Sequence, residues 1–239
     1  MEFISYALSA IVAYLLGSIS VSVIVSKIVY RRDIRKYGSG NAGATNMARV
    51  FGAIGGVVVL VGDFLKAVVS ICLAEYVFTL ISADAVPDVC VMLAGAFCVI
   101  GHAYPVFFKF KGGKGVTVGA AIALFADYRA LLVGLAVFVF VFAVSRIVSI
   151  SSVSAALAII AAGVAFYFLI DGFSLYMLIL CVFTGAFVIF LHRANIKRLL
   201  KGEEKKFSFA KKSAEKPATD RAEETENAEG KGETGEDDL

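Results

Sequence analysis

Residues 53–81 read AIGGVVVLVGDFLKAVVSICLAEYVFTLI, an apolar run interrupted only by a few charged side chains. A transmembrane helix needs about 20 apolar residues to cross about 30 Å of hydrocarbon, so this run is long enough to span a bilayer. Apolar residues make up 59% of the 239-residue chain, whereas about 45–50% is usual in soluble domains. They come in long blocks, unlike the spaced pattern of an amphipathic helix. The sequence therefore predicts an all-α polytopic membrane protein.

Six more apolar blocks lie on either side of this run. They extend over about Phe3–Val29, Val86–Tyr104, Gly115–Ala126, Arg129–Ser145, Ile150–Ile170 and Phe173–Leu191. The first block is longer than the apolar part of a signal peptide and lacks its basic start, so we expect it to be retained. We predict about seven transmembrane helices. Because the block at Gly115–Ala126 is short, a partial or tilted helix there, with fewer spans in total, is the alternative.

Positive charge is concentrated in every second connection between the predicted spans. The odd-numbered connections and the segment after the last span hold nearly all the basic loop residues: Arg31, Arg32, Arg35, Lys36, Arg49, Lys109, Lys111, Lys114, Arg146, Arg193, Lys197, Arg198 and Lys201. The even-numbered connections hold Asp84, Asp88, Asp127 and Asp171. Short loops rich in Lys and Arg stay in the cytoplasm. We therefore predict an N-terminus outside the cell and a C-terminus in the cytoplasm.

The end of the chain differs in composition from the rest. From Lys211 onward there are few apolar side chains and many charges, and such a segment buries too little surface to fold. We predict a transmembrane domain over residues 1–207 and a disordered cytoplasmic tail over residues 208–239. The four cysteines lie in or beside apolar blocks without a CxxC pair, so we expect small buried side chains and no metal site.

The first predicted cytoplasmic loop contains residues 33–49, DIRKYGSGNAGATNMAR. It combines glycines, neutral hydrogen-bonding side chains and a cation, namely Gly38, Gly40, Gly43, Ser39, Asn41, Thr45, Asn46 and Arg49. Glycines let backbone N–H groups converge on an anion, and a guanidinium binds two phosphate oxygens at once. The glycine spacing also matches a dinucleotide-binding fingerprint, but that motif follows a strand, and here a membrane helix precedes it. The loop therefore predicts phosphate binding.

The second loop contains residues 101–117, GHAYPVFFKFKGGKGVT. Its candidate binding residues are Lys109, Gly112, Gly113, Lys114 and Gly115, together with His102, for which packing is the alternative. A glycine after Lys114 excludes a P-loop, in which Ser or Thr would hold magnesium at that position. A single loop of this kind is more typical of non-specific binding to lipid head groups. Two glycine- and cation-rich loops on one face favour a phosphate site instead.

The third segment is HRANIKR, residues 192–198, directly after the last predicted span. His192 and Asn195 are three residues apart, a spacing that places two side chains on one face of a helix. An interfacial anchor is the alternative for His192. Ser149 and Ser152 add hydroxyl groups at the cytoplasmic start of the sixth predicted span.

Two charges lie inside the run quoted first, Asp63 and Lys66. A charge in a membrane costs about 2.5–3.5 kcal/mol on insertion scales, so we expect both to face the bundle interior and to pair. They also fit a rival function, a transporter or anion carrier in which the basic loops gather the transported anion. We detect no repeat between the two halves of the sequence, a feature that many transporters have.

The three motifs resemble those of the bacterial acyl-phosphate-dependent glycerol-3-phosphate acyltransferases, membrane enzymes that make lysophosphatidic acid for phospholipid synthesis. The family pattern GSGNxGATNxxR matches residues 38–49, GHxxPxFxxFKGGKGV matches residues 101–116, and HRxNIKRLLxGxExKF matches residues 192–207. The resemblance covers about residues 3–207. Ala42 stands where the family usually has Pro, and Ala194 stands where it usually has Glu.

This resemblance implies a set of site residues, substrates and partners. Ser39, Arg49, Lys114, His192 and Asn195 would lie in or near the active site, and Thr45, Asn46 and the motif glycines would form phosphate pockets that Ser149 or Ser152 joins. The implied substrates are acyl phosphate and glycerol 3-phosphate, without a cofactor or nucleic acid. The implied setting is a bacterial inner membrane with the site facing the cytoplasm, where the peripheral enzyme that makes acyl phosphate would be a partner.

The implied reaction is attack of the sn-1 hydroxyl on the acyl-phosphate carbonyl, with release of inorganic phosphate. Orientation of two substrates contributes on the order of 7–11 kcal/mol, and an oxyanion donor contributes roughly 3–4 kcal/mol. The His-x4-Asp dyad of soluble-type acyltransferases is absent, because Phe107 and Lys197 stand five residues after the two histidines. Our hypothesis is that His192 or a substrate phosphate oxygen accepts the hydroxyl proton.

Overall fold

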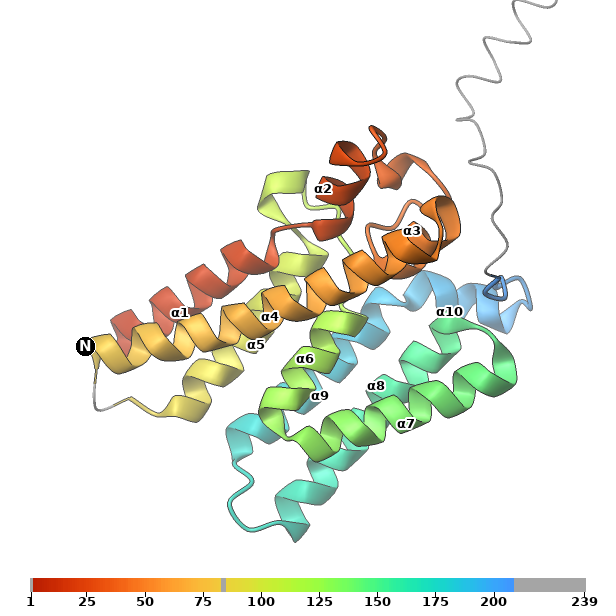
Figure 1. Cartoon of the computed structure of the whole chain (residues 1–239). Helices are drawn as coiled ribbons and strands as arrows, with labels where there is room; N and C mark the ends of the chain where they lie inside the picture. Colours follow the sequence, from red (N-terminus) through yellow and green to blue (C-terminus); the bar gives the residue numbers. More distant parts are fainter. Residues whose placement is uncertain (1, 83–84, 209–239) are drawn as a thin grey trace, which may run out of the picture.

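The computed structural model describes residues 2–82 and 85–208, and every regular element in these residues is a helix (Figure 1). The α-helices are α1 (Glu2–Gly17), α2 (Val21–Ile28), α3 (Ala44–Phe51), α4 (Ala53–Ile81), α5 (Pro87–Ala103), α6 (Val116–Ala126), α7 (Tyr128–Ser145), α8 (Val148–Leu169), α9 (Leu175–Leu191) and α10 (Arg193–Leu200); η1 (Ile34–Lys36) and η2 (Val106–Phe108) are 3-10 turns. The all-α prediction is confirmed. Almost all of the predicted tail lies outside the described residues.

Five helical segments of the described chain are long and apolar enough to cross a membrane. They are Glu2–Ile28, Ala53–Tyr76, Pro87–Phe108, Tyr128–Ser145 and Val148–Leu169. A sixth is present if α9 and α10, which are bent by 58° relative to each other, form one span. Helix α6 has 11 residues, about 16 Å of helix, which is too short for about 30 Å of hydrocarbon. The polytopic membrane fold is confirmed, while the count of seven spans and the orientation stay predictions.

The first apolar block, predicted as one membrane span, is broken between α1 and α2. Helix α1 ends at Gly17 and α2 begins at Val21. The Nζ of Lys66 on α4 donates to the carbonyl oxygen of Ile19 at 2.7 Å. A broken helix leaves backbone carbonyls without intrahelical partners, so this cation satisfies one of them inside the bundle.

The predicted pairing of the two intramembrane charges is confirmed. Nζ of Lys66 lies 2.9 Å from Oδ1 of Asp63, and both side chains are buried. The same Nζ lies 3.0 Å from Nδ1 of His102, at the end of α5. The three side chains therefore join α4, α5 and the break after α1.

The bundle is held by small residues at its closest helix contacts. A Cβ at Gly17 would lie 2.3 Å from the carbonyl oxygen of Cys98, and one at Gly101 would lie 2.3 Å from that of Tyr14. Glycine therefore allows α1 and α5 to approach backbone to backbone, which is a common arrangement in membrane helices.

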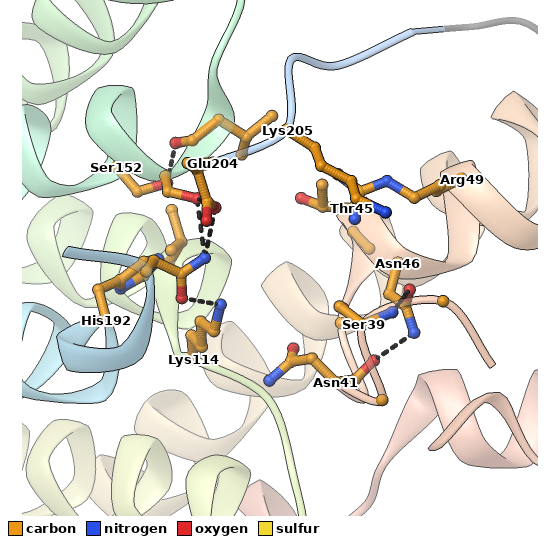
Figure 2. A pocket seen from close by; sticks show the side chains of 18 of the residues that line it. Ser39, Asn41, Thr45, Asn46, Arg49, Lys114, Ser152, His192, Glu204 and Lys205 are labelled. Carbon is orange, nitrogen blue, oxygen red and sulfur yellow. Dashed lines mark hydrogen bonds between the residues drawn. The ribbon is translucent and has the colours of Figure 1, made fainter. Parts of the chain in front are cut away.

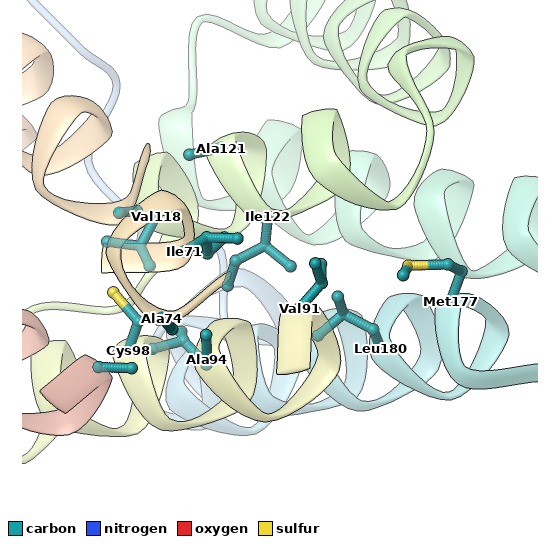
Figure 3. Close-up of a cluster of buried hydrophobic side chains, with 13 residues drawn as sticks. Ile71, Ala74, Val91, Ala94, Cys98, Val118, Ala121, Ile122, Met177 and Leu180 are labelled. Atoms are coloured by element: carbon teal, nitrogen blue, oxygen red, sulfur yellow. The ribbon is translucent and has the colours of Figure 1, made fainter. Parts of the chain in front are cut away.

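A cluster of buried apolar side chains fills the space between α4, α5, α6 and α9 (Figure 3). It includes Ile71, Val91, Ile122 and Leu180. All four cysteines are free and three are buried, but Cys72 is exposed on the bundle surface, so the prediction of burial is wrong for that residue.

The three motifs lie together at one end of the bundle. Figure 1 shows α2, α3 and α10 at the end opposite to the start of α1. The chain also passes through this end between α5 and α6 and between α7 and α8. The topology thus gathers on one side the loops that the sequence analysis singled out.

Candidate active site

A cavity of about 1010 Å³ opens among these loops. Fifteen of the eighteen site residues predicted from the sequence line it: Gly38, Ser39, Gly40, Asn41, Gly43, Thr45, Asn46, Arg49, His102, Lys114, Gly115, Ser149, Ser152, His192 and Asn195. Figure 2 shows two facing walls, with the first motif on one side and Lys114, His192, Ser152 and Glu204 on the other. The fold therefore brings residues from all three motifs to one space.

Asn46 shapes the first wall. Its side chain is buried, its Nδ2 donates to the carbonyl oxygens of Tyr37 and Asn41 at 3.0 Å each, and its Oδ1 accepts from the backbone N–H of Ser39 at 2.9 Å. Gly38 has φ +60°, and a Cβ there would lie 2.3 Å from Oδ1 of Asn46. These bonds hold the loop in shape, and the predicted contact of Asn46 with substrate stays a prediction.

The start of α3 provides the positive end of the first wall. The helix is capped by Gly43, which has no capping side chain, and Ala44 and Thr45 line the cavity. The first N–H groups of a helix lack intrahelical partners and favour an anion. Arg49, one turn further along, extends into the same space (Figure 2). This wall can bind a phosphate through backbone N–H groups and a guanidinium.

Lys114 and the start of α6 form a second cationic position on the opposite wall. Nζ of Lys114 donates to Oδ1 of Asn195 at 2.5 Å. Gly115 has φ +75° and precedes α6, whose first residues, Val116 and Thr117, also line the cavity. Burial lowers the pKa of Lys114 from 10.5 to about 8. Lys114 is therefore a cation at neutral pH that lies near its titration range.

Three predicted site residues of the second motif, Lys109, Gly112 and Gly113, do not line the cavity. Gly112 and Gly113 donate their backbone N–H groups to the carbonyl oxygens of Ala103 and His102, at 3.1 Å each. A Cβ at Gly113 would lie 2.2 Å from Nε2 of His102. Their N–H groups are thus engaged, and these glycines allow close packing of the loop on α5. Lys109 is exposed and does not line the cavity, so the structure does not bring it to the site.

His192 ends α9 at its junction with α10. Its Nδ1 lies 2.8 Å from the carbonyl oxygen of Val188. A carbonyl only accepts hydrogen bonds, so Nδ1 carries a proton and the neutral ring keeps its lone pair on Nε2. His192 and Asn195 both line the cavity, as their spacing predicted.

Glu204, which was not among the predicted site residues, occupies the centre of the second wall. Its Oε1 accepts from Nδ2 of Asn195 at 2.6 Å and from Oγ of Ser149, and its Oε2 accepts from Nε of Arg198 at 2.6 Å. Glu204 belongs to the third family pattern. Because it follows the last predicted span by more than ten residues, nothing in the sequence indicated its contact with Ser149 on α8. The hydroxyl of Ser152 donates to the carbonyl oxygen of Val148 at 2.9 Å.

Apolar side chains complete the cavity. Val50, Leu60, Val116, Phe138 and Val148 line it together with the polar groups. Leu60, which lies on α4, is exposed. The cavity therefore combines two cationic positions with an apolar side.

Comparison with known proteins shows which family the chain resembles. A family model described as glycerol-3-phosphate acyltransferase matches residues 7–202. A glycerol-3-phosphate acyltransferase of Geobacillus kaustophilus (strain HTA426) is 44% identical over 203 residues, which cover 85% of this chain and 96% of that protein. One of Bacillus subtilis (strain 168) is 39% identical, with coverage of 85% and 98%.

Two solved structures share the fold. A crystal structure of PlsY (YgiH), an integral membrane glycerol 3-phosphate acyltransferase, in its glycerol 3-phosphate form has a TM-score of 0.73 and 35% identity, and the match covers 85% of this chain and 96% of that one. The lysophosphatidic acid form has a TM-score of 0.71 and 34% identity, with coverage of 87% and 97%.

Proposed function

The chain belongs to the glycerol-3-phosphate acyltransferase family, and we propose that the donor of its acyl group is acyl phosphate. The acyl group passes to the sn-1 hydroxyl of glycerol 3-phosphate, which gives lysophosphatidic acid and inorganic phosphate. The enzyme is an integral membrane protein. Its site faces the cytoplasm of a bacterial inner membrane, where a peripheral enzyme supplies acyl phosphate.

The observation that carries this proposal is the pair of cationic positions on facing walls of one cavity. Arg49 with the start of α3 forms one, and Lys114 with the start of α6 forms the other. Glycerol 3-phosphate and acyl phosphate each carry a phosphate, so two anions must lie side by side. The apolar residues of the same cavity suit the acyl chain of the donor. An acyl thioester donor would leave one of the two positions without a phosphate next to the reacting carbonyl.

In the proposed reaction the sn-1 oxygen attacks the acyl carbonyl carbon, a new ester bond forms, and the bond between that carbon and the phosphate oxygen breaks. The cations hold the two phosphates, so that binding energy orients the reacting atoms. Lys114 or the N–H groups at the start of α6 offset the negative charge that develops on the carbonyl oxygen. The hydroxyl proton passes to Nε2 of His192 or to a substrate phosphate oxygen.

A donor assay tests this function. Purified protein in detergent micelles is given glycerol 3-phosphate with acyl phosphate, acyl-CoA or acyl carrier protein, and lysophosphatidic acid and inorganic phosphate are measured. Of the three donors, we expect only acyl phosphate to give lysophosphatidic acid. The amount of lysophosphatidic acid should equal the amount of inorganic phosphate released. Product with acyl-CoA in the absence of acyl phosphate would contradict the proposed donor. Chromatographic separation of the 1-acyl and 2-acyl isomers tests the position of acylation.

The proton acceptor is tested with His192→Ala and His192→Gln at saturating substrates. If His192 is the base, kcat falls by about 10²–10⁴-fold, the usual contribution of general base catalysis. Near-normal turnover of both variants assigns the proton to a substrate phosphate oxygen. Labelling of Lys201→Cys with a membrane-impermeant maleimide in inverted vesicles, and not in right-side-out cells, tests the cytoplasmic orientation.

A further inference from the structure

A short segment after α10 crosses the cavity and carries Glu204 into the second wall. We call residues 201–208 the strap. The backbone N–H of Phe207 donates to the carbonyl oxygen of Arg146 at 2.7 Å, and the ring of Phe207 packs edge-on against Phe142 on α7 at 6.0 Å between centroids. On the other side, Nε of Arg198 holds Oε2 of Glu204 at 2.6 Å. The strap is thus attached to α7 and α10, with the Glu204 carboxylate between them.

The Glu204 side chain lines the cavity but is only 9% exposed, because three protein donors surround its carboxylate. Ser149 on α8 and Asn195 on α10 donate to one oxygen, and Arg198 donates to the other. An ionised carboxylate can only accept hydrogen bonds, so each neighbouring group must turn a donor toward it. Three such bonds fix the orientation of the surrounding side chains.

That direction determines how Asn195 faces Lys114. An ionised carboxylate only accepts hydrogen bonds, so the NH₂ end of the Asn195 amide must turn toward Glu204, where it also donates to Oγ of Ser149 at 2.9 Å. The oxygen end of the amide is then left facing Lys114, which donates to it at 2.5 Å. With an amide in place of the carboxylate, Asn195 could turn either its NH₂ group or its oxygen toward residue 204, because an amide can donate as well as accept.

We propose that Glu204 is a positioning residue for acyl transfer, which acts through Asn195 to hold Lys114 in place and in its charged form. The proposal rests on the proposed role of Lys114 in holding a substrate phosphate. Glu204 itself does not bind substrate in this proposal; it sets the orientation and the charge of a residue that does.

The charge of Lys114 depends on the groups that surround it. Burial lowers its pKa to about 8, Glu204 raises this pKa, and Arg198 on α10 and Arg49 on α3 lower it. The other titratable or charged groups that line the cavity are Asp63, His102, His192, Lys36, Tyr37, Glu203, Lys205 and Lys206. Glu204 is the only carboxylate in contact with Asn195 among the residues that the structure describes. If Glu204 were uncharged, Lys114 would therefore lose its proton at a lower pH.

The test compares Glu204→Gln and Glu204→Asp with Asp171→Asn, a control that removes an exposed acid in the turn between α8 and α9. The kcat/KM for glycerol 3-phosphate is measured from pH 6 to 10 in micelles. We expect Glu204→Gln to lower kcat/KM at least tenfold and to move the alkaline midpoint of the profile down by roughly one pH unit. Glu204→Asp keeps the charge, so its midpoint stays near the wild-type value although its rate is reduced. The control follows the wild-type profile.

An unchanged alkaline midpoint in Glu204→Gln, with kcat/KM within twofold of wild type, would overturn the proposal. If Glu204→Gln fails to fold, Glu204→Asp decides: this variant keeps the charge, so a fall of its alkaline midpoint by roughly one pH unit contradicts a role of the charge. If wild-type protein does not use acyl phosphate, the proposed donor is wrong, and the same profiles are recorded with the donor that it does use.

Discussion

Nζ of Lys66 lies 3.0 Å from Nδ1 of His102, so a cation of α4 is bonded to the last turn of α5 inside the bundle. An ammonium group only donates hydrogen bonds, which makes Nδ1 of His102 the acceptor. The same ammonium reaches Asp63 and the carbonyl oxygen of Ile19. These contacts join α4, α5 and the break between α1 and α2 at the base of the cavity, and they account for the intramembrane charges without a transport path.

We therefore expect Lys66→Met to be strongly destabilising, because it leaves the Asp63 carboxylate buried without its partner. Removal of one member of a buried ion pair costs about 3–5 kcal/mol. The thermal unfolding midpoint in detergent measures the effect. The double variant Asp63→Asn/Lys66→Met should recover a large part of the loss, because no unpaired charge remains. An unfolding midpoint of Lys66→Met equal to that of the wild type would contradict the stabilising role of Lys66.

The charge of Lys114 predicts the pH dependence of the reaction. A lysine is positively charged below its pKa, and burial brings the pKa of Lys114 to about 8. Activity should therefore be full near neutral pH and fall as the pH rises through about 8. Lys114→Arg keeps its charge at every accessible pH, so this alkaline decline should disappear in that variant even if its rate is lower. An identical decline in both proteins would assign it to another group.

Loss of the Lys114 charge should affect catalysis more than folding. We expect Lys114→Met to lower kcat/KM by about 10²–10³-fold, as is found when one donor to a developing oxyanion is removed. Lys109→Met is the matched control, because Lys109 is exposed and lies outside the cavity lining. Equal losses in the two variants would indicate a general effect of loop charge on binding to an anionic micelle or membrane surface.

Helices α1 and α5 cross so closely at Gly101 that we expect this position not to tolerate the methyl group of an alanine. Gly101→Ala would place a Cβ 2.3 Å from the carbonyl oxygen of Tyr14, a backbone atom. We expect a loss of about 1–3 kcal/mol or more from overpacking, measured as a lower unfolding midpoint. Gly119→Ala is the control, since its Cβ would lie 3.3 Å from a side-chain methyl carbon of Thr184, which can move slightly.

Much of the architecture follows from the sequence, because each hydrophobic block is long enough to dictate a helix. The alternation of basic connections also predicted that the three motifs share one side, and the topology agrees. The break after Gly17 could not be predicted in this way. Beside the break lie a close approach of Gly17 to the backbone of Cys98 and a hydrogen bond from Lys66 to Ile19, which join residues far apart in the sequence.

The sequence predicted most of the residues that line the cavity, but not the contacts that each of them makes. Gly112 and Gly113 resemble a phosphate loop in sequence, yet their N–H groups bond to the end of α5. Asn46 looks like a donor for substrate, yet its amide is used within its own loop. Glu204 lies in the third family pattern, but its neighbours in the sequence do not indicate its role, which depends on the hydrogen bond between the strap and Ser149 on α8.

The apolar side of the cavity has a consequence for how the enzyme should be assayed. Leu60 lines the cavity, is exposed and belongs to the candidate membrane span Ala53–Tyr76, so we expect a fatty chain to pass between site and bilayer without entering water. The relevant concentration of the lipid substrate is then its mole fraction in the micelle or vesicle. Turnover should show surface dilution: added inert detergent slows the reaction at constant bulk amounts of every component.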